Sequence, residues 1–397
     1  MSYDLGLWNL GRSVAEYFAG IGLMRLGLEQ AGWKVVWAND IDPTKQAMYL
    51  GHFGYREEEF ALGDVHALDA DAIPSTALAT ASFPCNDLSL AGARRGLAGT
   101  QSGAFWGFAD ALEAMNGRRP ALVLLENVAG FLSSHDGNDF RDVCLRLNAL
   151  GYDVDAFLID AIHFVPQSRA RLFIVGSPHA AARARIMEES PSFFQGPGRP
   201  PSLADFIAWH PEIRWAVRSL PLLPKRPLSL ADILEPLSPN SAFWWSQARV
   251  DYLLGQMSDR HRRIANQMIK DSKISYGTIF RRVRHGRSMA ELRTDGIAGC
   301  LRTPRGGSGR QILLEAGRGN AAARLLTPLE CARLMGADEF RIGSDISLNQ
   351  ALFGFGDAVC VPVIRWIAEN YLNPLFAELS GDEESLLKRR VVRYGRA

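Results

Sequence analysis

The chain has 397 residues, of which 47% are hydrophobic and 22% are charged, a composition typical of a soluble globular protein with one large domain and a smaller one. No apolar run approaches the roughly 20 residues that a membrane span needs, and no basic start followed by an apolar run opens the chain as in a signal peptide. The formal net charge of +1 does not exclude a nucleic-acid partner, because a near-neutral total can hide a basic face.

The first half of the chain alternates between predicted strands and helices. Short apolar strands are expected at residues 14–19, 34–39, 77–83, 121–126 and 172–176. Helical periodicity is expected between them at residues 21–31, 105–115 and 139–150. This order predicts an α/β fold with a doubly wound, Rossmann-like and mostly parallel sheet, whose strand ends are where ligands bind.

From about residue 178 the chain becomes rich in proline and irregular, and residues 196–201 have the composition of a linker. A second, smaller and less regular domain is therefore expected. Helical periodicity returns at residues 327–335 and 359–371, so we expect the final segment to pack back on the first domain. The predicted divisions are residues 1–178, 179–323 and 324–397.

The first predicted strand leads into a glycine turn. Gly20 and Gly22 precede a helix, where the backbone lets a ligand approach and the helix N-terminus favours electron-rich groups. Asp40 ends the next strand, where its carboxylate suits a ribose diol, and Asp64 follows a third strand end. Taken alone, a glycine turn of this kind is as common without a ligand as with one. Each aspartate, taken alone, is equally well explained as a helix cap or turn residue. Together they predict a nucleoside pocket.

The five cysteines are scattered and contain no Cys-x-x-Cys pair, which favours reduced thiols in the cytoplasm and argues against structural zinc. They are Cys85, Cys144, Cys300, Cys331 and Cys360. Cys85 follows Pro84 at a predicted turn, the exposed setting that a nucleophilic thiolate needs. A single cysteine is nevertheless more often a buried core residue.

Polar residues stand at two further strand ends. Glu126 and Asn127 close a strongly apolar strand, where burial would raise the pKa of an acid and suit it to donate a proton. Arg169 and Arg171 precede another strand at alternate positions, so they point to one side and could hold a carbonyl or phosphate oxygen. A solvated strand edge explains the two arginines equally well.

Eight short motifs occur in order: FAGIG at residue 18, NDID at 39, GD at 63, FPC at 83, ENV at 126, PQSRARLFIVG at 166, RLLTPLECARLMG at 324 and FGDAVCVP at 355. They resemble the ordered motifs of the DNA cytosine-5 methyltransferases of bacteria and phages, which places residues 178–297 in the variable, target-recognition region. No single motif is decisive, but eight in the right order are highly specific.

The resemblance implies methyl transfer from S-adenosylmethionine to carbon 5 of a cytosine flipped out of duplex DNA. By the same resemblance, Cys85 adds to carbon 6 while Glu126 binds or protonates nitrogen 3. Arg171 then contacts the cytosine carbonyl oxygen, and Arg169 supports a phosphate or a loop. Asn127 is expected to order the loops rather than react.

The resemblance also implies a set of cofactor-binding residues: Phe18, Gly20, Gly22, Asp40, Ile41, Asp64, Val65, Pro84, Phe105, Asp357 and Val359. Three positions depart from the family pattern. Asn86 follows the catalytic Pro-Cys where a glutamine is usual, Asp357 replaces an asparagine beside the cofactor, and Cys300 replaces a threonine. Asp357 leaves cofactor affinity or choice open, and Cys300 is interpreted as structural.

A basic stretch lies within the variable region. Residues 259–293 hold ten Lys or Arg against three Asp or Glu, which predicts a phosphate-binding face. The residues expected to contact DNA are Ser89, Arg281, Arg282, Arg284, Arg305, Gly306 and Gly307. Burial in the small domain explains Trp244 and Trp245 better than stacking on bases does.

Two alternative functions remain open. An RNA cytosine-5 methyltransferase of the tRNA-modifying branch shares the cysteine and glutamate motifs, although the long basic recognition segment favours DNA. A catalytically silent DNA-binding relative is the second alternative, kept open by Asn86 and Asp357. We expect a monomer in the bacterial cytoplasm or nucleoid, with double-stranded DNA as partner, a separately encoded restriction endonuclease as candidate partner, no membrane association and no metal.

Overall fold

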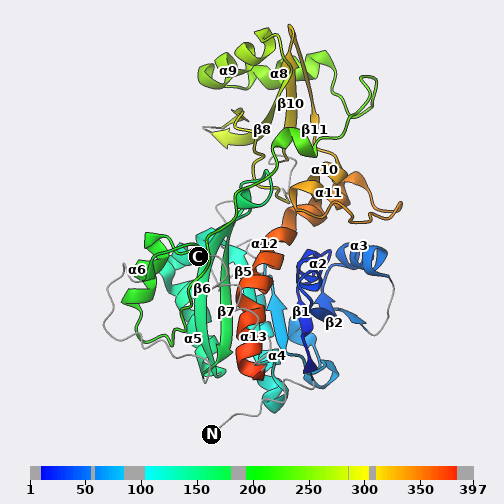
Figure 1. Ribbon diagram of the computed structural model, residues 1–397. Coiled ribbons are helices and arrows are strands. Elements are labelled where there is room, and N and C mark those ends of the chain that lie inside the picture. Colours follow the sequence, from blue (N-terminus) through cyan, green and yellow to red (C-terminus); the bar gives the residue numbers. More distant parts are fainter. Residues whose placement is uncertain are drawn as a thin grey trace, which may run out of the picture.

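The computed structural model describes residues 10–54, 59–84, 103–179, 194–284, 286–303 and 310–381. Five of the expected site residues lie outside the described residues: Cys85, Ser89, Arg305, Gly306 and Gly307. The described chain forms two lobes, a large one built on a seven-stranded sheet and a small one built on a four-stranded sheet (Figure 1).

The large sheet has the strand order β3-β2-β1-β4-β5-β7-β6. The first five strands in the chain pair in parallel, whereas β7 is antiparallel to both of its neighbours, β5 and β6. The strands are β1 (Ser13–Tyr17), β2 (Lys34–Asp40), β3 (Phe60–Leu62), β4 (Leu78–Ala81), β5 (Leu122–Val128), β6 (Tyr152–Asp160) and β7 (Ala170–Pro178). The predicted doubly wound, mostly parallel α/β fold is therefore confirmed.

Helices cover both faces of this sheet, which is why its central strands are apolar along their length. Leu122 and Leu124 of β5 face one apolar cluster, and Val123 and Leu125 face the other. The first cluster contains α2 (Leu23–Glu29) and the second contains α4 (Ala104–Ala114) and α5 (Asn138–Ala149). Another helix, α3 (Pro43–Phe53), lies beside β2 and β3.

The C-terminal segment packs on the large lobe, against α2. Its helices are α12 (Val361–Ile367) and α13 (Asn373–Ser380), joined by the π-helical residues Ala368–Leu372. The helix α12 packs so closely on α2 that a Cβ atom at Gly27 would lie 2.7 Å from Ile364. Leu348–Ser380 is long and apolar enough to cross a membrane, but 67% of its apolar window is buried in the protein, and this burial explains the apolar composition.

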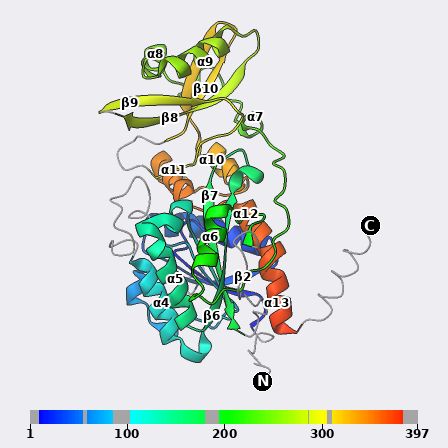
Figure 2. The same cartoon turned by 90° about the vertical axis from the view of Figure 1, so that its left-hand side faces the viewer.

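The small lobe contains a regular antiparallel sheet that the sequence pattern did not predict. Its strands follow the order β11-β10-β8-β9 and are β8 (Ser275–Arg284), β9 (Arg287–Arg293), β10 (Ile312–Gly317) and β11 (Asn320–Leu325). Two helices, α8 (Gln247–Gly255) and α9 (Asp259–Lys270), cover one face of it. Between the lobes lie α10 (Pro328–Leu334) and α11 (Leu348–Asp357) (Figure 2).

The segment after the large sheet packs on the large lobe, although its proline-rich composition predicts a second domain from residue 179. Its helix α6 (Pro201–Trp209) packs Phe206 on Phe140 of α5, with ring centroids 4.8 Å apart. The backbone of Val154 in β6 bonds to Arg214 and Ala216. Leu220 lies in the core of the large lobe, and Leu230 and Ile233 of the short helix α7 (Leu230–Ile233) belong to the same apolar cluster, so we propose that the first domain extends beyond residue 178 through these residues.

Candidate active site

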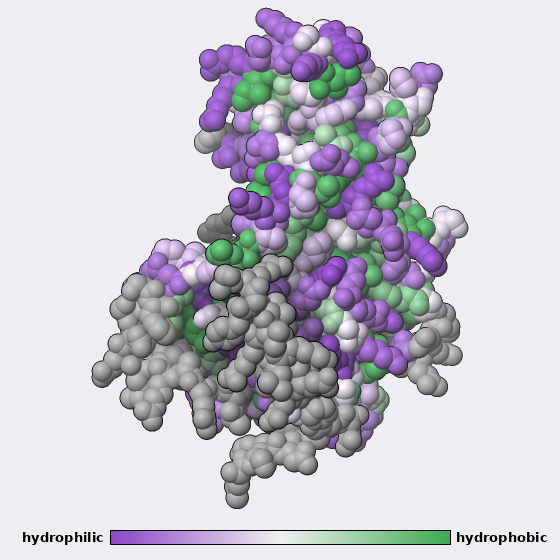
Figure 3. Space-filling model, in the orientation of Figure 1, coloured by the Kyte–Doolittle hydropathy of each residue, from purple (hydrophilic) through white to green (hydrophobic). Residues whose placement is uncertain are grey.

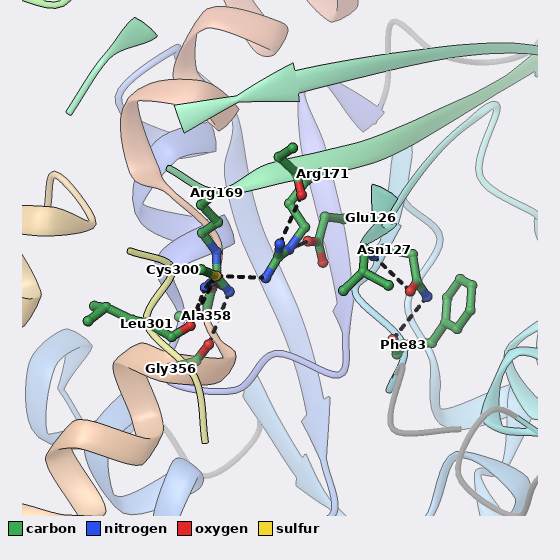
Figure 4. A network of polar contacts seen from close by, with 11 residues as sticks. Phe83, Glu126, Asn127, Arg169, Arg171, Cys300, Leu301, Gly356 and Ala358 are labelled. Atoms are coloured by element: carbon green, nitrogen blue, oxygen red, sulfur yellow. Dashed lines mark hydrogen bonds and ion pairs between the residues drawn. The ribbon is translucent and has the colours of Figure 1, made fainter. Parts of the chain in front are cut away.

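An ion pair joins two neighbouring strands at one end of the large sheet. Arg171 Nε lies 2.8 Å from Glu126 Oε1, and both side chains are nearly buried. The pair forms because β5 and β7 are antiparallel, in a register that places Arg171 opposite Val128, two residues beyond Glu126. A second guanidinium nitrogen of Arg171 donates to the backbone oxygen of Ala170. Two of the predicted catalytic residues are thus brought into contact (Figure 4).

Arg169 is the buried centre of a second set of contacts. Its side chain is only 3% exposed. One terminal nitrogen donates to the backbone oxygen of Leu301, and the other donates to the backbone oxygens of Gly356 and Ala358 (Figure 4). Of the two roles expected for Arg169, the support of loops is therefore the one that its contacts match. It ties the start of β7 to the end of α11 and to the segment that leaves the small lobe.

Cys300 lies between these two arginines. Its sulfur is 3.3 Å from Arg169 Nη1 and 3.9 Å from Arg171 Nη2 (Figure 4). Burial raises the pKa of the Cys300 thiol, but the positive charges of Arg169, Arg171 and Arg302 outweigh burial, so the net shift of the pKa is downward. The sequence reading of Cys300 as structural missed this setting, because the arginines are distant in the chain.

Asn127 connects the end of β5 to the segment that enters Cys85. Its Nδ2 donates to the backbone oxygen of Phe83 at 3.3 Å, and its Oδ1 accepts from the backbone nitrogen of Val128 at 2.8 Å. Both groups of the amide are used in these backbone contacts (Figure 4). This arrangement agrees with the expectation that Asn127 orders loops.

The turn between β1 and α2 has the backbone geometry of a ligand-binding loop. Phe18, Gly20 and Gly22 have φ angles of 54°, 57° and 84°, and such a value is strained for the non-glycine Phe18. The two glycines serve different purposes. A Cβ atom on Gly22 would lie 2.3 Å from Phe53, so this glycine permits helix packing, whereas a Cβ atom on Gly20 would meet nothing within 4 Å.

Asp40 is held beside this turn. Its two carboxylate oxygens accept from the backbone nitrogens of Gly20 at 2.8 Å and Asp42 at 2.9 Å. The next residue, Ile41, is 66% exposed, so its side chain is open to contact with a ligand at this strand end. The open space at Gly20, the fixed carboxylate of Asp40 and the exposed Ile41 fit a nucleoside.

Asp64 lies at the end of the neighbouring strand. Its side chain is exposed, and its Oδ1 accepts from the backbone nitrogen of His66 at 3.0 Å. One carboxylate oxygen therefore acts as a helix cap, which is the structural role considered for this residue. Asn39 places this strand end by donating to the backbone oxygens of Ala61 and Gly63. Asp64 therefore caps a turn and still faces solvent.

The remaining expected pocket residues are less exposed. Val65, Phe105 and Val359 are buried, and Pro84 is half-buried. Phe105 packs on Phe83, with ring centroids 5.5 Å apart. Their contact with a cofactor stays a prediction.

Asp357 has two partners that sequence reasoning missed. Lys45 Nζ of α3 lies 3.0 Å from Asp357 Oδ2, and the Thr303 hydroxyl donates to Asp357 Oδ1. An aspartate in place of the usual amide could have suggested a nearby cation, but no local pattern indicates which one. Among the described residues, no three His, Cys, Asp or Glu side chains gather as a metal site requires.

Three of the expected DNA-contacting arginines lie on β8 of the small lobe. Arg282 and Arg284 are exposed, and each pairs with Glu291 of β9, at 3.1 and 3.0 Å. Arg282 also lies over the ring of Phe280, whereas the half-buried Arg281 occupies the alternate position of the strand. Hydrophilic residues gather around the top of this lobe, where α8 and α9 lie (Figure 3).

The two tryptophans of the small lobe are packed rather than free. Arg249 lies over the Trp245 ring at 3.7 Å and Arg324 over the Trp244 ring at 5.1 Å. Trp244 packs on the main core and Trp245 on the core of the small lobe. This placement supports the interpretation that both rings are structural.

Comparison with known proteins gives one consistent family. The family model described as C-5 cytosine-specific DNA methylase matches residues 13–373. The chain is 30% identical to the type II methyltransferase M.DsaV of Dactylococcopsis salina over 360 residues, which cover 90% of this chain and 85% of that one. It is 26% identical to M.Bsp6I of Bacillus sp. over 360 residues, covering 90% and 97%, and 27% identical to M.HhaI of Haemophilus parahaemolyticus over 364 residues, covering 91% and 94%.

Solved structures show the same fold. The Dnmt2 methyltransferase of S. pombe matches with a TM-score of 0.59 and 18% identity, covering 91% of this chain and 98% of that one. A putative DNA modification methyltransferase encoded within an E. coli prophage matches with a TM-score of 0.53 and 17% identity, covering 91% and 98%. At these identities the likeness concerns the fold alone.

Proposed function

The chain belongs to the C-5 cytosine-specific DNA methylase family, and we propose that it methylates a cytosine flipped out of duplex DNA through a covalent adduct with Cys85. The observation that carries this proposal is the ion pair of Glu126 with Arg171 at the end of β5. Beside it, Asn127 holds the segment that leads into Cys85. An acid, a guanidinium and the approach to a thiol thus share one strand end.

The chemistry needs these groups because carbon 5 of cytosine is a poor nucleophile. The Cys85 thiolate forms a bond to carbon 6, and the electrons of the 5,6 double bond form a double bond between carbons 4 and 5. The electrons of the double bond between carbon 4 and nitrogen 3 move to nitrogen 3, which takes a proton from Glu126. Carbon 5 becomes the nucleophilic end of an enamine. After methylation, a base takes the proton from carbon 5, and the electron pair of that bond forms the 5,6 double bond again. The bond from carbon 6 to sulfur breaks, Cys85 leaves as the thiolate, and the proton on nitrogen 3 returns to Glu126.

Arg171 has two tasks in this proposal. Its contact with Glu126 orients the carboxyl group toward the base, and its charge stabilises the cytosine carbonyl oxygen as electron density moves onto the ring. Arg169 has an indirect role in this proposal. It donates to the backbone oxygens of Leu301 and Ala358 and so holds the loops that contain these residues.

S-adenosylmethionine fits as the cofactor and, when bound, supplies an electrophilic methyl group. In this proposal Asp40 accepts from the ribose hydroxyls and Ile41 covers the adenine, with Asp64 at the neighbouring strand end. The open space beside Gly20 allows close approach to the backbone. The proposed pocket also includes the buried Val359 and Phe105.

DNA is the proposed substrate, because the curated relatives are type II methyltransferases and the small lobe exposes arginines on β8. Arg281, Arg282 and Arg284 are proposed to contact phosphates, together with Ser89 and the segment of residues 305–307. Phosphate contacts release counterions, so DNA affinity should fall steeply with salt concentration. Type II relatives also suggest a restriction endonuclease as partner and the bacterial cytoplasm as location.

The deciding experiment incubates wild-type and Cys85→Ala protein with S-adenosylmethionine and mixed-sequence duplex DNA, and in parallel with tRNA. Digested nucleosides are then analysed by mass spectrometry. Formation of 5-methylcytosine in DNA by the wild type alone supports the proposal. Methylation of tRNA instead would favour the RNA enzyme, and DNA binding without any product would favour the silent relative. Residual transfer by Cys85→Ala would contradict the covalent mechanism.

A further inference from the structure

Lys45 is surrounded by acidic side chains at the edge of the proposed cofactor pocket. Its ammonium nitrogen lies 3.0 Å from Asp357 Oδ2, and the side chains of Lys45 and Asp357 are 25% and 45% exposed. Burial lowers the pKa of Lys45, but the carboxylates of Asp357, Asp40 and Asp42 outweigh burial and raise the pKa above its ordinary value. The positive charge of Lys45 therefore interacts with three carboxylates, and one of them, Asp40, is the proposed ribose ligand.

Asp357 stands at an unfavourable place for an acid. It is the last residue of α11, where the exposed backbone carbonyls already make the helix end negative. Two cations from elsewhere in the large lobe compensate for this charge. Arg169 donates to the backbone oxygens of Gly356 and Ala358 on either side, and Lys45 pairs with the Asp357 side chain itself.

The same helix end receives the segment that leaves the small lobe. A Cβ atom on Gly356 would lie 2.7 Å from the backbone carbon of Arg302, so the two backbones are in direct contact. Thr303 donates its hydroxyl to Asp357 and also contacts the backbone oxygen of Phe353. The carboxylate of Asp357 thus bridges α3, beside the proposed cofactor pocket, and residues 302–303.

We propose that Lys45 is a positioning residue for the cofactor site. By neutralising Asp357 at the end of α11, Lys45 keeps the negative charge of Asp357 from repelling the carboxylate of Asp40, which is the proposed ribose ligand. This inference rests on the proposed function, because it takes the pocket at Asp40 to be the S-adenosylmethionine site. The same pair explains how position 357 can hold an aspartate, because Lys45 of α3 supplies the compensating positive charge.

A double-mutant cycle tests the proposal. The dissociation constant of S-adenosylmethionine is measured by calorimetry for the wild type, Lys45→Met, Asp357→Asn and the double variant. Lys45→Met should weaken binding about fivefold, as expected for a partly exposed charge left without its partner. Asp357→Asn is the second arm of the cycle: it removes the charge that Lys45 neutralises and keeps an acceptor for Thr303. The double variant should bind more tightly than Lys45→Met and within about twofold of Asp357→Asn, because without Asp357 the loss of Lys45 leaves no unpaired charge.

Rescue is the decisive result, because loss of the packing of Lys45 would impair the single and double variants equally. Equal weakening of both, or unchanged binding by Lys45→Met, overturns the proposal. Arg141→Met is the matched control, since Arg141 and Glu212 form a similarly exposed pair at 2.8 Å between distant segments, and it should bind the cofactor normally.

The failure of this inference is distinguishable from that of the proposed function. A wild type that binds and transfers methyl groups, with no rescue in the cycle, contradicts only the role of Lys45. A wild type with no affinity for S-adenosylmethionine contradicts the cofactor assignment and the role of Lys45 together.

Discussion

Arg171 Nε lies 2.8 Å from Glu126 Oε1, across the antiparallel pair of strands β7 and β5. The contact matters because the two groups are proposed to act on the same cytosine, one at nitrogen 3 and one at the carbonyl oxygen. A guanidinium bound to the carboxyl group restricts its rotation, so the acid is oriented before the base arrives.

Glu126→Gln should therefore reduce the rate of methyl transfer by a factor of about 10² to 10⁴, the usual contribution of a general acid. The glutamine amide can still contact Arg171 but cannot supply a proton in the same way. Single-turnover transfer to duplex DNA measures the loss, and calorimetry should show unchanged cofactor affinity. Glu113→Gln, at an exposed ion pair with Arg146, is the control and should keep full activity. A Glu126→Gln enzyme with wild-type rate would remove this residue from the mechanism.

Most of the candidate site residues that the sequence predicts lie at the ends of strands. Gly20, Asp40 and Glu126 were predicted as site residues because ligands bind where parallel strands end and apolar runs locate those ends, whereas Arg171 was predicted from its place before another strand. The contact between Glu126 and Arg171 required the antiparallel strand β7, whose pairing no local pattern specifies.

Other features depended on tertiary contacts. The apolar pattern did not predict strand β6, because this strand contains buried polar residues that have partners. One of them is Asp155, which pairs with Arg199 at 2.8 Å. The same pair holds residues 196–220 on the large lobe, against the boundary expected from the proline-rich composition. The surroundings of Cys300 likewise come from residues far away in the chain.

Arg324 and Glu330 form a fully buried ion pair between β11 and α10, where the small lobe meets the large one. Glu330 also accepts from the backbone nitrogens of Thr327 and Glu235. Glu330→Gln would leave the Arg324 charge uncompensated, and breaking a buried pair in this way costs about 3–5 kcal/mol. Urea unfolding should show this loss in the free energy of unfolding.

The exposed pair of Arg141 and Glu212 provides the comparison. Glu212→Gln should cost less than about 1 kcal/mol, because water solvates both partners. Similar losses for the two glutamine variants would mean that the buried pair adds no more than a surface pair.

Cys300 should be the most reactive of the cysteines within the described residues. The neighbouring arginines lower the pKa of its thiol, whereas burial raises the pKa of Cys144, Cys331 and Cys360. Alkylation of Cys85→Ala protein at pH 7.5, about one unit below the ordinary thiol pKa, should label Cys300 first in peptide mass spectrometry. Arg302→Ala should slow this labelling, because it removes one of the stabilising charges. Faster labelling of a buried cysteine would show that exposure by local opening, rather than the arginines, controls reactivity.

Glu16 of β1 should make the stability of the large lobe depend on pH. Its carboxyl group is fully buried beside Tyr49 and the backbone nitrogen of Arg25, and burial raises its pKa from 4.5 to about 8. Because the folded protein holds this proton more tightly than the unfolded chain, the stability that it contributes is complete below pH 4.5 and is lost as the pH rises through about 8.

Glu16→Gln stays neutral throughout this range, so the variant should lose this pH dependence. Relative to the wild type, its free energy of unfolding should rise by on the order of 3 kcal/mol between pH 5 and pH 9. Urea unfolding at half-unit steps of pH measures the difference, with Glu29→Gln as the control, since Glu29 is partly exposed and pairs with the same Arg25. Parallel stability curves for wild type and Glu16→Gln would mean that Arg25 keeps Glu16 ionised in the folded state, because an ionised carboxylate would titrate like that of the unfolded chain.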